Sequence, residues 1–229
     1  MNVRALPLVT LILGLATLGA FVVLGSQPAV SSVYAAGEVS TYVSAFQRSE
    51  TLGDIAAVFG SPIDPAKIAA MDALNTLDLY AFIPAYALFL VAAAIMLGGL
   101  TNRWTQIAII FGLLGAVGDV IETWKQLQLT GDIDNAEAHL PIAPWHWLKY
   151  GALALNGVAI ASLCFTAPKK RWILGGIALV SFPLVVLSYM GAITPRAFAA
   201  TFALYWIALL VIAAIETIRP SAPAASSPP

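Results

Sequence analysis

The chain alternates between long apolar segments and shorter polar ones. Six apolar segments reach about 20 residues, the length that a helix needs to cross the core of a bilayer. They cover, with soft edges, residues 6–24, 77–100, 104–124, 147–165, 172–190 and 197–218. Because backbone polar groups cannot be left unpaired in lipid, each segment is predicted to be helical. The pattern predicts an all-α fold, a polytopic membrane helix bundle with six transmembrane helices in a single domain over residues 1–219.

Composition supports this prediction and excludes a soluble domain. Hydrophobic residues make up 60% of the chain and charged residues only 10%, with a mean hydropathy of +0.86. In soluble domains about a quarter of the residues are charged. The formal net charge of -1 does not point to nucleic acid binding. We therefore expect membrane lipid as a partner, no nucleic acid, and no protein partner that the sequence identifies.

The two ends of the chain differ in character. A short basic start, MNVR, precedes the first apolar segment, and Val33-Tyr34-Ala35 is typical of a signal-peptide cleavage site. That site lies well beyond the end of the segment, and the segment is longer than a usual signal core, so we expect an uncleaved anchor. Residues 220–229 are only proline, serine and alanine, which predicts a disordered tail.

Basic residues between the segments indicate an orientation. Placing the N-terminus inside leaves Glu216 as the single acid on the inner side. The basic residues on that side are Arg4, Arg103, Lys169, Lys170, Arg171 and Arg219. They lie near the chain termini and in very short connections, where the positive-inside rule is most reliable. We expect a multi-pass protein of a bacterial inner membrane with both termini cytoplasmic.

Two long loops lie on the outer side. In the first, residues 25–76, Asp64 before Pro65 predicts a helix start that continues into the second span as an amphipathic extension. In the second, residues 126–146, Gly131, Pro141 and Pro144 argue against a long helix. We expect these loops to cap the bundle without forming a separate soluble domain.

Four ionisable residues are predicted to meet at one depth of the bundle. Asp119 and Glu122 are three residues apart, so they share a helix face. At about 1.5 Å per residue from the start of its span, Asp119 lies roughly 22 Å along the helix. Asp78 begins the second span and Lys149 begins the fourth, and both starts are on the side where the third span ends. Tyr80, His146 and Tyr150, which lie nearby in sequence, are possible accessory members.

The chemistry of such a cluster allows three interpretations. A lone carboxylate in a membrane costs roughly 2.5 to 3.5 kcal/mol on insertion scales. Lys149 can offset one carboxylate, and at least one other carboxyl group is expected to keep a proton, as in a general acid or a proton-coupling group. The cluster is then a structural ion pair between helices, a ligand or catalytic pocket, or a route for protons or ions.

The sequence offers no recognised pattern of metal ligands. His139 and His146 are seven residues apart in a loop, near Asp132, Asp134 and Glu137. This spacing differs from known motifs such as two histidines four residues apart on one helix. We expect no metal site and no cofactor.

Several stretches together resemble an uncharacterised family of bacterial polytopic membrane proteins. They are AFQRSETLGDIAAVFG, LDLYAFIPAYALFL, GDVIET and a lysine that enters the next span. In that family an amphipathic segment with an acidic residue precedes an Asp-aromatic-Tyr helix, an Asp-x-x-Glu helix and a Lys-bearing helix. The resemblance covers about residues 42–163. It maps the family's polar positions onto Asp78, Tyr86, Asp119, Glu122 and Lys149.

The chain departs from the family in two places. Thr123 follows Glu122 where asparagine is expected, and Gln47-Arg48 stand where glutamate and an apolar residue are expected. The family has no assigned activity, so the resemblance implies that the cluster matters without implying what it does.

Three functions are compatible with the sequence. The first is an integral membrane protein that binds a small or lipid-like ligand at an outward-facing cluster, or acts as a membrane scaffold. An alternative is a membrane-embedded enzyme acting on a lipid or amphiphile through carboxyl acid/base chemistry. A second alternative is a proton-coupled transporter, although no inverted repeats are visible. A pocket lined by the acids fits a binder or an enzyme, a dry paired cluster fits a scaffold, and polar groups that continue to the inner side fit a transporter.

Overall fold

The structure, a computed structural model, describes residues 5–35, 38–167 and 170–219 and contains no β-strand in them. Six of its helices are long and apolar enough to cross a membrane, as predicted. Arg4, Lys169 and the tail 220–229, on which parts of the sequence predictions depend, lie outside the described residues. The helices are, in chain order, α1 (Ala5–Gly25), α2 (Pro28–Ser31), α3 (Val39–Gln47), α4 (Leu52–Phe59), α5 (Pro65–Leu77), the π-helix η1 (Asp78–Phe82), α6 (Ile83–Gly98), α7 (Arg103–Gly131), the 3-10 helix η2 (Ile133–His139), α8 (Ala143–Thr166), α9 (Trp172–Tyr189) and α10 (Pro195–Ile218).

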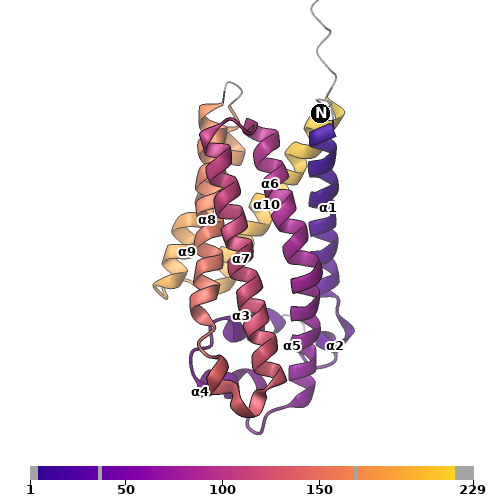
Figure 1. Cartoon of the computed structure of the whole chain (residues 1–229), viewed down its shortest axis with the longest axis vertical. Coiled ribbons are helices and arrows are strands. Elements are labelled where there is room, and N and C mark those ends of the chain that lie inside the picture. The colour runs from indigo at the N-terminus through magenta and orange to yellow at the C-terminus, as the bar shows by residue number, and fades with distance from the viewer. Residues whose placement is uncertain (1–4, 36–37, 168–169, 220–229) are drawn as a thin grey trace, which may run out of the picture.

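The long helices form a bundle with two different ends. The start of α1 and the end of α10 lie at one end, which we call the terminal end, whereas α2 to α5 and η2 lie at the other, the loop end (Figure 1). Helix α8 packs between α7 and α9, while α1 packs against α6 and α10. Contacts of α6 with α7 and of α9 with α10 join the two groups.

Two helices extend beyond their apolar segments at the loop end. Asp64 caps α5 as predicted, because its Oδ1 accepts a hydrogen bond from the Ala66 amide at 2.9 Å. From there the helix continues through η1 into α6 without a break. Helix α7 runs past residue 124 to Gly131, since Gln126 and Leu129 are buried against neighbouring elements.

The second loop is shorter than predicted. Helix α8 already begins at Ala143, so Pro144 lies in its first turn and not in the loop. Proline is tolerated there because the amide groups of the first turn have no partner within the helix. The remaining loop residues form only the short helix η2.

The two loops pack together around an apolar core of their own. This core is separate from that of the bundle and includes Phe46, Ile55, Phe59, Met71, Leu129 and Ile142. The Ser49 carbonyl accepts hydrogen bonds from the amides of Ile142 (2.9 Å) and Ala143 (3.4 Å), which links the first loop to the start of α8. We call α2, α3, α4 and η2, together with their connections, the cap.

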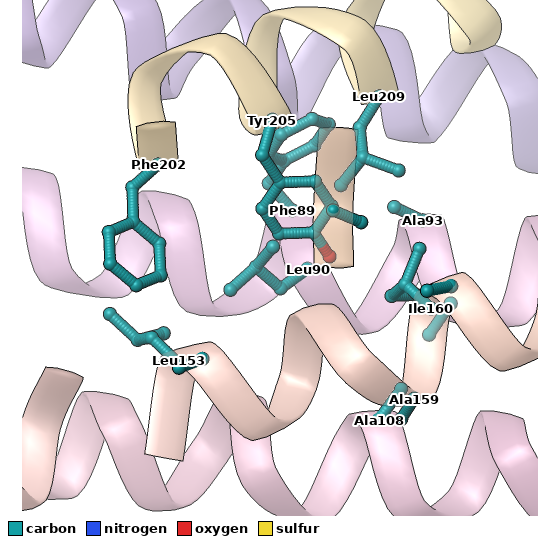
Figure 2. Packing of buried hydrophobic residues seen from close by; sticks show 14 of the residues in the cluster. Phe89, Leu90, Ala93, Ala108, Leu153, Ala159, Ile160, Phe202, Tyr205 and Leu209 are labelled. Atoms are coloured by element: carbon teal, nitrogen blue, oxygen red, sulfur yellow. The ribbon is translucent and has the colours of Figure 1, made fainter. Parts of the chain in front are cut away.

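The core of the bundle combines large side chains with small ones. Figure 2 shows large residues of α6, α8 and α10 meeting in its centre: Phe89, Leu90, Leu153, Ile160, Phe202, Tyr205 and Leu209. Alanines allow the helices to approach closely, as at Ala108 of α7 and Ala159 of α8 (Figure 2). One polar link crosses this core, because the Tyr205 hydroxyl donates to Asn156 Oδ1 at 2.9 Å while Asn156 Nδ2 donates to the Ala108 carbonyl at 2.7 Å.

Candidate functional site

Glycines on α7 place the lysine of α8 next to the acids of α7. A Cβ atom built on Gly118 would lie 2.9 Å from the Lys149 amide nitrogen, and one on Gly115 would lie 3.3 Å from the Lys149 carbonyl oxygen. Small residues, and glycine above all, allow two helix backbones to come this close. Asp119 and Glu122, on the same stretch of α7, are thereby brought within reach of the Lys149 side chain.

Lys149 bridges the two acids. Its Nζ donates hydrogen bonds to Asp119 Oδ1 at 2.8 Å and to Glu122 Oε1 at 3.0 Å. All three side chains are buried. Such charge-assisted hydrogen bonds offset part of the free energy that burying each charge costs. The structure thus places together three of the four residues predicted as the cluster.

Tyr86 brings α6 into the cluster. Its hydroxyl donates a hydrogen bond to Asp119 Oδ2 at 2.9 Å, and its side chain is fully buried. Both carboxylate oxygens of Asp119 therefore have a partner, one on α6 and one on α8. Only the family resemblance had indicated Tyr86 from the sequence.

His146 lies on the far side of Glu122. Its Nδ1 is 3.5 Å from Glu122 Oε2, too far for a well-formed hydrogen bond. Within the described residues, neither ring nitrogen of His146 has a hydrogen-bond partner, and neither has Glu122 Oε2. The imidazole ring packs edge-on against Tyr150, with 4.8 Å between ring centroids.

Asp78, the fourth predicted residue, is joined to the cluster more loosely. It begins η1, and its Oδ2 accepts a hydrogen bond from the Thr123 hydroxyl of α7 at 3.3 Å. Among the described residues Asp78 makes no ion pair. Thr123, which replaces the asparagine expected from the resemblance, therefore supplies the group that contacts Asp78. A π-helix at this point is notable because such single wide turns are often found at functional sites.

The cluster forms one wall of a cavity of about 250 Å³. The polar side chains that line it include those of the cluster, Asp78, Tyr86, Asp119 and Lys149, together with Thr17, Gln47 and Tyr150. Glu122 and His146 do not line it. The other walls are largely apolar and come from η1, α1, α6, α8 and α10. They include Phe21, Phe82, Phe89, Phe202 and Trp206.

The cavity opens sideways between α1 and α10. These helices touch about halfway along α1, where a Cβ atom on Gly14 would lie 2.7 Å from Leu210 Cδ1. Toward the loop end they diverge (Figure 1). Cavity-lining residues on both sides of this gap, Phe21 on α1 and Ile207 on α10, are also exposed on the outer surface of the bundle. Gln47 of the cap closes the loop end of the cavity.

The structure does not bring every predicted residue into the site. Tyr80, which was predicted as a possible accessory member, is 73% exposed and does not line the cavity. Tyr150 does line the cavity, and its ring centroid lies 4.9 Å from Lys149 Nζ.

Sequence reasoning missed Gln47 and Trp206. Trp206 carried a usable signal, because it lies in the middle of its apolar segment and not near an end, where membrane-interface tryptophans are found. Gln47 carried only the signal that the resemblance expects a polar residue at its position.

The second histidine belongs to the cap. His139 Nε2 lies 3.2 Å from Asp132 Oδ2, and the His139 carbonyl accepts a hydrogen bond from Lys125 Nζ at 2.9 Å. His146 instead faces Glu122. Within residues 5–35, 38–167 and 170–219, no group of three or more His, Cys, Asp or Glu side chains is arranged to hold a metal ion.

Comparison with known proteins leaves the site to be interpreted from its geometry. No protein-family model, no curated protein and no solved structure matches the chain.

Proposed function

We propose that this protein is a multi-pass membrane protein that binds a lipid-like amphiphile in the cavity between α1 and α10. The polar headgroup lies against the wall formed by Asp78, Tyr86, Asp119 and Lys149, and the tail extends through the lateral opening. The observation that supports this most is the shape of the cavity, which is polar on one wall, apolar elsewhere and open toward the lipid-facing surface. Ligand sites typically combine apolar walls with a few convergent polar groups in this way.

Some acids of the cluster line the cavity and one does not, and this difference supports binding over a purely structural role. Glu122 lies outside the cavity and pairs with Lys149, as expected for a link between α7 and α8. Asp78 and Asp119 instead line the cavity. A structural ion pair needs no cavity beside it, whereas a binding site needs polar groups on its wall.

The position of the cavity favours binding over transport. Its charged residues lie toward the loop end, while Gly14 and Leu210, on α1 and α10, mark its opposite end. Thr17, which lies near Gly14, donates its hydroxyl hydrogen bond to the Leu13 carbonyl of its own helix. Toward the terminal end, the buried polar groups of Asn156 and Tyr205 are hydrogen-bonded to each other and do not line the cavity.

The test is to narrow the lateral opening without touching the polar wall. Ala203 lines the cavity and is exposed at the opening, so Ala203→Phe is expected to weaken binding of a dodecyl amphiphile at least tenfold. Leu204→Phe is the matched control, because Leu204 is exposed on the same helix and does not line the cavity. Binding would be measured by equilibrium dialysis of a labelled dodecyl glucoside against the protein in nanodiscs, with empty nanodiscs as blank. Equal, non-saturable uptake by wild type and both variants would contradict the proposal.

A further inference from the structure

We infer that the cavity selects amphiphiles with a positively charged ammonium headgroup, which Asp78 and the aromatic rings of Phe82, Tyr86 and Trp206 hold. This inference rests on the proposed function, because it specifies the headgroup of the amphiphile in the same cavity. It is supported by the charges at the polar wall, by the aromatic residues beside Asp78 and by the geometry of η1.

The charges of the cluster are unbalanced. Its three carboxyl groups, on Asp78, Asp119 and Glu122, face one lysine ammonium. Lys149 donates hydrogen bonds to Asp119 and Glu122, while Asp78 has a hydroxyl neighbour and no ion pair among the described residues. A cationic headgroup at Asp78 reduces this imbalance, whereas an anionic headgroup increases it. In a membrane interior, where charges are poorly screened, this difference favours the cation.

Three aromatic rings that line the cavity pack against one another, and one of them, that of Phe82, comes from the same turn as Asp78. The rings of Tyr86 and Trp206 stack with centroids 5.0 Å apart, and the Phe82 ring lies 5.3 Å from Tyr86 and 6.0 Å from Trp206. All three side chains contribute to the cavity wall. Aromatic faces attract cations, most strongly where water is excluded, and groups of them recognise quaternary ammonium compounds.

The wide turn of η1 presents the carboxylate and one of the rings together. Asp78 and Phe82 are its first and last residues, and the Ile83 amide donates to the Asp78 carbonyl to close the turn. Both side chains line the cavity. One turn of backbone therefore supplies both kinds of group that bind an ammonium ion, a carboxylate and an aromatic ring.

The experiment compares ligands that share a dodecyl tail and differ in the headgroup. Dodecyltrimethylammonium, dodecyl glucoside and dodecanoate would be dialysed against the protein in nanodiscs of an uncharged glycolipid, so that neither surface charge nor a lipid ammonium group interferes. Wild type is expected to bind the trimethylammonium ligand at least tenfold more tightly than the other two. Asp78→Asn is expected to remove this preference, and Trp206→Leu to reduce it.

Asp72→Asn is the matched control. Asp72 is on α5, outside the cavity, and its carboxylate accepts a hydrogen bond from the Thr130 hydroxyl at 2.6 Å, so the variant should keep the preference. Equal affinity for the three ligands, all weakened by Ala203→Phe, would overturn the headgroup inference and leave the proposed function standing. A preference for dodecanoate would also overturn it and would assign the headgroup to Lys149. Absence of saturable binding of any ligand would overturn the proposed function itself. If Asp78→Asn fails to fold, the relative affinities of wild type for the three ligands still test the headgroup inference.

Discussion

Gly118 of α7 lies so close to Lys149 of α8 that an added Cβ atom would be 2.9 Å from the lysine amide nitrogen. The neighbour is backbone and cannot rotate away, so a larger residue must push the helices apart. Gly118→Ala is therefore expected to lower the free energy of unfolding by about 1 to 3 kcal/mol, the usual cost of overpacking. Thermal unfolding in detergent would measure the change.

Gly151→Ala provides the control for this substitution. Gly151 is also inside a long helix of the bundle, α8, but a Cβ atom there would meet no atom within 4 Å. Because alanine favours helix more than glycine does, this variant should be as stable as wild type or slightly more so. Equal effects of the two variants would contradict the close contact at Gly118.

Removing the Lys149 ammonium group should lower the free energy of unfolding. Lys149→Met leaves Asp119 and Glu122 without their shared partner, and breaking a buried pair costs about 3 to 5 kcal/mol. Asp119→Asn in the same background removes one unpaired charge and should restore part of the stability. A double-mutant cycle on unfolding free energies would measure this coupling. Strict additivity of the two substitutions would mean that the Lys149–Asp119 pair does not act as described.

The hydroxyl of Tyr86 should contribute to stability, and that of Tyr80 should not. Tyr86→Phe removes the hydrogen bond to Asp119, and a bond to a charged group contributes about 1.5 to 3 kcal/mol. Tyr80→Phe, on the same continuous helix, changes an exposed side chain and should stay within about 0.5 kcal/mol of wild type. Chemical unfolding in mixed micelles would compare the two, and similar losses would argue against the Tyr86–Asp119 contact.

The cap should weaken in acid through Asp54. The Asp54 carboxylate closes a capping box at the start of α4, where it accepts hydrogen bonds from the amides of Glu50 (3.0 Å) and Thr51 (2.9 Å). These bonds hold the pKa of Asp54 below its usual range. A carboxyl group whose pKa is lowered by folding stabilises the fold above the unfolded-state pKa of about 4. That stability is lost as pH falls through the lowered pKa of the folded state.

Asp54→Ala should therefore destabilise the cap at pH 7 and have a smaller effect near pH 3. Hydrogen exchange of the α4 amides, corrected for the intrinsic pH dependence of exchange, would measure the difference at each pH. Asp134→Ala, at an exposed acid of η2, is the control. A difference between wild type and Asp54→Ala that stays constant from pH 7 to 3 would contradict this role of the capping box.

The helices and the charged cluster could be predicted from the sequence. Long apolar segments stand out from the polar connections between them, and charged residues stand out beside the apolar segments. Six segments of membrane length and the start of α5 at Asp64 could be read directly from the chain. Asp119, Glu122 and Lys149 could be brought together because charges in hydrocarbon need partners. The Asp64–Pro65 signal depends only on local backbone chemistry, which explains why it was reliable.

The cavity itself was not readable from the sequence. Its walls on α1 and α10 are apolar, and an apolar residue facing a cavity has the same pattern as one facing lipid. The opening depends on how α1 and α10 cross near Gly14 and Leu210, which is a property of tertiary packing. For the same reason the extension of α7 to Gly131 was missed, since its last residues are held by contacts with other elements.

Trp206 reports directly on whether an amphiphile enters the cavity. Its side chain lines the cavity, so a bound amphiphile with a brominated tail should quench its fluorescence. If the amphiphile binds in the cavity, wild type will show a saturable component of quenching that is absent from Trp206→Phe. Quenching that rises linearly with ligand and is the same in both proteins would show that the amphiphile only partitions into the surrounding lipid.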